Sequence, residues 1–276
     1  MNVIFVPTDF SEVSHCAIDY AAELAVLTSA KLVIFHSCEV PVLSPDGTVV
    51  VPMDVIQDDS LKSLKKTAEH LRKKYGKTLT VESEQAIGFP VEEINRAVVK
   101  FKADLIIIGM QGGGFITEKI VGSITTSLIK RAKCPVLAIH KGTKFKPIKK
   151  IALACDYHKL TYPTVLKPVK ELATLFKSEI LILNVVHELE EVPTISKAAE
   201  GVKLNRALDG IKHSFHYMIN HDVTDGISDF VKENEIDLIA MVPHSHTVIE
   251  TIFKESNTKH MAFHVAKPLL AIHDKE

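Results

Sequence analysis

The strongest constraint on this chain is an internal repeat. The segment Leu238–His273 aligns with Leu105–His140 without a gap, at a constant offset of 133 residues, and both segments end in the tetrapeptide LAIH. Residues 172–186 similarly repeat the pattern of residues 24–38. A chain of 276 residues is long enough for two domains of ordinary size. We therefore predict two tandem domains of one fold, comprising residues 1–146 and 147–276.

Strand and helix patterns alternate through the first repeat. Short apolar runs predict strands at residues 1–7, 31–37, 77–87, 105–108 and 135–139. Helical spacing of apolar residues predicts helices at 11–27, 57–75, 91–101 and 122–132, with Ser11 as an N-cap and Pro90 at a helix start. Residues 41–52 show no periodicity, and we expect a loop or lid there. The alternation predicts an α/β fold in which each domain is a Rossmann-like, five-stranded parallel sheet with helices on both faces.

A glycine-rich stretch follows the fourth predicted strand. Its spacing is Gly109-x2-Gly112-x9-Gly122-Ser123. Glycine allows the backbone to approach a ligand closely, and Ser123 is expected to cap a helix whose free N–H groups favour an anion. The P-loop pattern G-x-x-x-x-G-K-[ST] is absent. The stretch therefore predicts a phosphate-binding loop, at the strand ends where ligands bind to parallel sheets.

The charge and hydrophobicity of the sequence indicate which classes of partner are not expected. The net charge is −1, so no bulk attraction to nucleic acid or to an anionic membrane is expected. Lysines and arginines on the 57–75 helix are interpreted as a solvated face. No apolar stretch has the length of a membrane span, and no signal peptide pattern opens the chain. Four cysteines without C-x-x-C spacing are expected to be free thiols in a cytoplasmic protein.

The glycine spacing resembles the nucleotide-binding signature of the universal stress protein family, in its ATP-binding branch. The opening strand and its Pro7-Thr8-Asp9 turn are similar to the start of that family's domain. The resemblance implies an adenine nucleotide alpha hydrolase-like fold and ATP, with Mg²⁺, as the ligand of the first domain. The implied binding residues are Pro7, Thr8, Asp9, Ser37, Gly88, Ile108, Gly109, Gly112, Gly122, Ser123 and Ile124.

The resemblance also implies roles for these residues. Asp9 would lie near the ribose or the metal-bound phosphates, Ser37 would meet the adenine edge through its backbone, and Ile108 would pack on the base. The glycines of the motif, with Ser123 and Ile124, would hold the phosphates and ribose. The last strands, Val136–Ile139 and Leu269–Ile272, are expected to pair within one chain as an intramolecular pseudo-dimer, and two chains could form a homodimer.

The function implied is that of an ATP-responsive stress or regulatory module. No catalytic residue is assigned, because the motif contains one carboxylate, Asp9, and no clear cation beyond Lys119. Two alternatives remain open: a slow ATPase or autophosphorylating enzyme, and a nucleotide-independent scaffold or chaperone-like protein.

The second repeat departs from the first at the motif. Gly109, Gly112 and Gly122 are replaced by Val242, Ser245 and Glu255, and Ser256 alone is retained. A glutamate at the helix start would repel phosphate, so this domain is predicted not to bind ATP. Ten of the 14 histidines lie in the second domain. One hypothesis is a Zn²⁺ site; the alternative is that His244 and His246 lie on an exposed loop and His213 and His216 on strand edges. The candidate ligands are Asp156, His221, His244 and His246.

Overall fold

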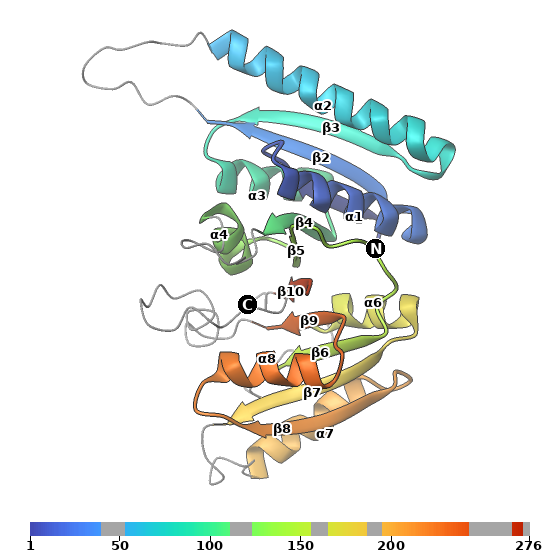
Figure 1. The fold of residues 1–276 in the computed structure, drawn as a ribbon, viewed down its shortest axis with the longest axis vertical. Helices are drawn as coiled ribbons and strands as arrows, with labels where there is room; N and C mark the ends of the chain where they lie inside the picture. Colours follow the sequence, from blue (N-terminus) through green and yellow to red (C-terminus); the bar gives the residue numbers. More distant parts are fainter. Residues whose placement is uncertain (40–52, 111–122, 156–164, 187–194, 243–266, 273–276) are drawn as a thin grey trace, which may run out of the picture.

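The computed structural model describes residues 1–39, 53–110, 123–155, 165–186, 195–242 and 267–272. Ten strands form one sheet (Figure 1). The strands are β1 (Val3–Pro7), β2 (Lys31–Cys38), β3 (Val81–Ile87), β4 (Leu105–Met110), β5 (Val136–His140), β6 (Lys150–Ala154), β7 (Glu179–Val186), β8 (His213–Ile219), β9 (Leu238–Met241) and β10 (Leu269–Ala271). The helices are α1 (Glu12–Thr28), α2 (Met53–Tyr75), α3 (Pro90–Phe101), α4 (Ser123–Arg131), α6 (Lys167–Phe176), α7 (Ile195–Ala207) and α8 (Val223–Glu233), with a 3-10 turn, η1 (Gly76–Thr78).

The two halves of the sheet share one strand order. The full order is β3-β2-β1-β4-β5-β10-β9-β6-β7-β8, so each half places its first strand at the centre. Pairing is parallel within each half. Only the central pair, β5 with β10, is antiparallel, with Leu270 opposite Leu137. The predicted α/β class, with parallel sheets and helices on both faces, is confirmed.

Helices cover both faces of this sheet (Figure 1). Apolar side chains of α1, α2, α6 and α7 share one buried cluster with one face of the strands. Those of α3, α4 and α8 share a second cluster with the opposite face. Because each cluster contains residues from both halves, the core runs without interruption across the β5–β10 seam.

Helix α1 begins as its sequence predicts. Ser11 is the N-cap, with extended backbone, and its hydroxyl accepts a hydrogen bond from the Ser14 N–H at 3.3 Å. Glu12 lies in the first turn, where a negative charge is favourable. Pro90 likewise occupies the first turn of α3. Local capping signals therefore fix where the helices flanking the strand ends begin.

Two aspartates in equivalent positions tie neighbouring strands together. Asp104, just before β4, accepts hydrogen bonds from the backbone N–H groups of Asn2 and Val3. Asp237, just before β9, does the same for Lys149 and Lys150, at 2.9 and 3.2 Å. The two aspartates are 133 residues apart, which is the offset of the sequence repeat.

The linker between the halves is fixed by aromatic packing. Phe145 packs edge-on against Tyr20 of α1, with ring centroids 5.0 Å apart, and lies 6.1 Å from the ring of Phe176 of α6. Aromatic pairs at these distances stabilise their neighbours beyond simple burial. Phe145 therefore joins a helix of the first half to a helix of the second.

Several predicted boundaries differ from the structure. The third strand was expected from Lys77, but η1 occupies Gly76–Thr78 and β3 starts at Val81. The Thr78 hydroxyl bonds to the Tyr75 carbonyl at 2.6 Å, which holds this segment in a turn. Helix α2 starts at Met53 rather than at residue 57, and β4 continues through Gly109 to Met110. The predicted loop or lid at 41–52 lies outside the described residues.

None of the four cysteines, all of which are described, forms a disulfide bond. Among the described residues, no helix is long and apolar enough to cross a membrane.

Candidate functional site

The first half has a point where the strand order reverses, between β1 and β4. The chain runs outward through β2 and β3, returns to the centre, and continues through β4 to β5. Ligands of parallel sheets bind outside the carboxyl ends of the strands at such a point. The structure brings two predicted segments together there: Pro7, Thr8 and Asp9 at the end of β1, and Ile108 and Gly109 near the end of β4.

Thr8 is buried and holds the turn after β1. Its N–H donates to the Phe35 carbonyl at 2.8 Å, which continues the pairing with β2. Its hydroxyl accepts from the Phe10 N–H at 3.0 Å and lies 2.9 Å from the Ser14 hydroxyl. Phe10 takes the left-handed region, with φ of 64°. The network fixes the backbone that presents Asp9 at the sheet edge.

Asp9 is an exposed carboxylate held in place by Ser11. One carboxylate oxygen accepts from the Ser11 N–H at 3.0 Å and from its hydroxyl at 2.6 Å. Partial burial works against ionisation, but the hydrogen bonds from Ser11 outweigh it and lower the pKa of Asp9. Asp9 therefore carries its negative charge throughout the neutral pH range.

Gly109 has a packing role that the sequence did not predict. A Cβ at this position would lie 2.4 Å from Cγ1 of Val13 and 2.8 Å from the Val13 carbonyl carbon and oxygen. The glycine thus allows α1 to lie directly against β4. The Gly109 carbonyl accepts from the Thr125 hydroxyl of α4 at 3.0 Å. Close packing against α1 is therefore one reason for a glycine at this position, and the expected role of Gly109 in ligand binding stays a prediction.

Ser37 and Gly88 lie together at the ends of β2 and β3. The Ser37 hydroxyl donates to the Gly88 carbonyl at 2.9 Å, and the Gly88 N–H donates to Cys38 at 3.0 Å. Gly88 has φ of 147°, and a Cβ there would lie 2.8 Å from the carboxylate of Glu93. The Ser37 side chain is thereby used to join two strands, which leaves its backbone as the part available to a ligand.

The start of α4 carries the remaining described residues of the motif. Ser123 is the first helical residue and is exposed, so it lies one position inside the helix rather than at the predicted N-cap. Ile124 packs against the core, and Ile108 is buried. Gly112 and Gly122 lie outside the described residues. Their predicted contacts with phosphate stay predictions.

Sequence reasoning missed two hydroxyls at this site, those of Ser14 and Thr125. Both are buried and both lie in the first turn of a helix. A serine three residues after an N-cap serine is a recognisable signal for the first. The second could not be foreseen, since it depends on where α4 lies relative to Gly109.

The second half differs at the equivalent strand end. Val242, which replaces Gly109, is buried in the core cluster on the α6 side of the sheet. Of the four candidate metal ligands, only His221 is described, and it is exposed; Asp156, His244 and His246 lie outside the described residues. Within the described part, no three histidine, cysteine or acidic residues cluster for a metal ion.

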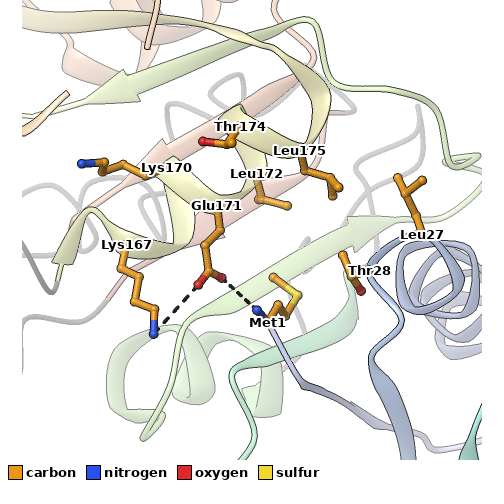
Figure 2. Close-up of a pocket in the computed structure, with 9 residues that line it drawn as sticks. All are labelled: Met1, Leu27, Thr28, Lys167, Lys170, Glu171, Leu172, Thr174 and Leu175. Atoms are coloured by element: carbon orange, nitrogen blue, oxygen red, sulfur yellow. Dashed lines mark ion pairs between the residues drawn. The ribbon is translucent and has the colours of Figure 1, made fainter. Parts of the chain in front are cut away.

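A cavity lies away from these strand ends, beside the amino end of β1. It has a volume of about 610 Å³ and is lined by the end of α1, the start of α6 and Met1 (Figure 2). Glu171 lies 3.5 Å from the Met1 amine and 3.9 Å from Lys167 Nζ, and Figure 2 shows it between them. Since this cavity is at the opposite end of β1 from Asp9, it is distinct from the site at the carboxyl ends.

Comparison with known proteins identifies relatives of this chain. Residues 1–140 match the model of the universal stress protein family. Universal stress protein MJ0531 of Methanocaldococcus jannaschii is 29% identical over 144 residues, covering 51% of this chain and 83% of that protein. Universal stress protein YxiE of Bacillus subtilis is 30% identical over 145 residues, covering 50% of this chain and 98% of that protein.

A solved structure extends the likeness of fold to the whole chain. The crystal structure of a universal stress protein from Archaeoglobus fulgidus superimposes with a TM-score of 0.73, at 16% identity, covering 98% of this chain and 97% of that one. At that identity the match concerns the fold alone. The family match over residues 1–140 and the YxiE relationship together show that the chain belongs to the universal stress protein family.

Proposed function

We propose that the first half binds ATP with Mg²⁺ at the carboxyl ends of β1 and β4, and that the protein is a nucleotide-responsive stress or regulatory module. The observation that carries the proposal is that the end of β1, before Asp9, and the end of β4, with Gly109 as the first glycine of the motif, lie on neighbouring strands where the strand order reverses. In sheets of this type that point is where nucleotides bind.

The described residues have chemistry suited to this ligand. Asp9 is exposed and ionised, and a carboxylate is a ligand that Mg²⁺ prefers, directly or through water. Ser123 lies exposed at the start of α4, where unpaired backbone N–H groups favour phosphate. Ser37 and Gly88 lie at the ends of neighbouring strands, on the same edge of the sheet. Bound Mg²⁺ would supply the positive charge that offsets the phosphates.

The residue types favour binding over phosphoryl transfer. An efficient transferase needs a positioned base, neutralisation of charge and an aligned acceptor. Among the eleven proposed binding residues, Asp9 is the one carboxylate and none is cationic. We therefore assign the site to ligand binding, with a response transmitted through the conformation or assembly of the chain.

Calorimetric titration of nucleotide-free protein with Mg-ATP tests the proposal. We expect one ATP per chain, because the second half has Val242, Ser245 and Glu255 in place of the motif glycines. Gly122→Glu copies the substitution of the second half and places a negative charge at the phosphate loop. It should weaken ATP binding by at least about a hundredfold, through charge repulsion and loss of backbone approach.

Gly201→Glu is the matched control. It adds the same charge on α7, where a Cβ would meet nothing within 4 Å. Unchanged ATP affinity in Gly122→Glu, with the fold intact, would exclude the phosphate-loop assignment. Saturable ATP binding without any change in hydrogen exchange or sedimentation would favour the scaffold alternative, in which the nucleotide is a structural ligand. Steady release of ADP would favour the slow ATPase.

A further inference from the structure

A second cavity lies at the junction between the two halves. Its volume is about 350 Å³, and its walls come from α1, the linker between β5 and β6, and the residues just before β9 and β10. It shares no lining residue with the proposed nucleotide site. We call it the junction cavity, and its chemistry is independent of the glycine motif.

Positive charge dominates the lining of the junction cavity. Four lysines face one aspartate, Asp237: Lys141, Lys144, Lys146 and Lys267. Lys141 and Lys146 each pair with a carboxylate, at 2.5 and 2.6 Å. Lys144 and Lys267 form no ion pair with any residue that the structure describes. Within the described ranges, two ammonium groups of the cavity therefore have no carboxylate partner.

Tyr20, a residue of the core, contributes a hydroxyl to the same cavity. The residue is only 3% exposed, its ring packs on Phe145, and its hydroxyl has no hydrogen-bond partner among the described residues. Burial, and after it the nearby carboxylate of Asp237, raises the pKa of Tyr20 above its usual range, so the hydroxyl keeps its proton. A tyrosine hydroxyl that opens onto the cavity can donate its proton to a ligand or to water.

We propose that the junction cavity binds a phosphate-type oxyanion, either inorganic phosphate or the phosphate group of a small molecule. Lys144 and Lys267 supply ammonium donors, and Tyr20 donates its hydroxyl proton from the inner wall. Buried Ile148 and Pro268 add apolar surface. A volume of about 350 Å³ is at the lower end of the range for small-molecule pockets, which suits a compact anion.

The position of the site gives the anion a structural consequence. Tyr20 belongs to the first half, Lys144 to the linker, and Lys267 to the segment that leads into β10. An anion held by all three bridges the halves, so binding stabilises the folded chain by mass action. This ligand is separate from the nucleotide and could be bound together with it.

The test uses pyrophosphate as the first probe, in magnesium-free buffer with EDTA, on the full nucleotide-free chain. Calorimetry should show one saturable site per chain whose affinity falls as salt is added. Tyr20→Phe keeps the ring on Phe145 and removes only the hydroxyl. Tyr20→Phe and Lys267→Gln should each weaken pyrophosphate binding by about tenfold, because each removes one hydrogen bond to a charged group.

Lys65→Gln is the matched control, because Lys65 lies exposed on α2, far along the sequence from any lining residue of the cavity. It should bind pyrophosphate like the original protein. Parallel titrations with inorganic phosphate and glycerol 3-phosphate distinguish the two sources of the anion. Tighter binding of inorganic phosphate indicates the free ion, and tighter binding of glycerol 3-phosphate indicates the phosphate group of a small molecule. Absence of saturable binding, or original affinity in both Tyr20→Phe and Lys267→Gln, would overturn the proposal.

The two sites are separated by reciprocal variants. Gly122→Glu should lose Mg-ATP and retain pyrophosphate, whereas Tyr20→Phe should retain one Mg-ATP per chain. If Gly122→Glu also abolishes pyrophosphate binding, the anion occupies the nucleotide loop and the junction site is wrong. If ATP does not bind at all, the proposed function is wrong, but the comparison of pyrophosphate binding between the original protein, Tyr20→Phe and Lys267→Gln still tests the junction cavity.

Discussion

Lowering the pH from 7.5 to 5.5 should destabilise the protein through one histidine, His140. This residue ends β5 and is 2% exposed, and neither ring nitrogen has a hydrogen-bond partner among the residues that the structure describes. Burial lowers the pKa of His140 below its usual value. The imidazole of His140 therefore takes up a proton near pH 6.5 in the unfolded chain, and only at a lower pH in the folded chain. Stability is retained above that pH and lost below it, by about 1.4 kcal/mol over this interval if the folded ring does not titrate.

Urea unfolding at both pH values, on the original protein and on His140→Met, measures this difference. Methionine fills the position without polar atoms and lies beside Met110 of β4, so the variant should be folded and about 1.4 kcal/mol less sensitive to the change of pH. His213→Gln, on the outer strand β8, controls for removing a histidine elsewhere. Equal pH dependence of His140→Met and the original protein would show that His140 is hydrated or protonated in the folded chain.

Two further substitutions test the packing of the strand ends. Gly109→Ala should cost about 1–3 kcal/mol of stability, because its methyl group meets the Val13 backbone at 2.8 Å; Gly201→Ala, in open space, should show no such loss in the same urea assay. Asp237→Asn should lose the ion pair with Lys146 and cost about 1–3 kcal/mol. Although burial alone would raise it, the pKa of Asp237 is lowered by Lys146 and two backbone N–H groups. The stabilisation from Asp237 is therefore present above the carboxyl's ordinary pKa and lost as the pH falls through its folded value. An unchanged acid midpoint in Asp237→Asn would contradict this account.

The fold was predictable wherever local signals decided it. Alternating strand and helix patterns predicted the correct type for each described α-helix and β-strand of the first half, and Ser11 and Pro90 marked helix starts correctly. The start of β3 was wrong, because the turn at Gly76–Thr78 depends on a side-chain bond to Tyr75 that periodicity does not reveal.

The position of the candidate site in the sheet could be predicted from the sequence, but the packing role of Gly109 could not. Asp9 and Gly109 were expected at the carboxyl ends of neighbouring parallel strands, and β1 and β4 do pair in parallel. The role of Gly109 depends on how closely α1 approaches β4, which is a distance between segments far apart in sequence. The junction cavity was not foreseen for the same reason, since Tyr20, Lys144 and Lys267 are brought together only by the folded chain.

The β5–β10 seam has a consequence for how the protein behaves at different concentrations. Strand β5 is bonded to β4 and β10, and β10 to β5 and β9, so neither keeps an open edge. An uncovered strand edge invites pairing with other chains. When a separate chain must cover such an edge, protection fails on dilution; when the cover is part of the same chain, it does not. In this protein, β10 of the same chain pairs with β5, so the edge of β5 stays paired even at low protein concentration.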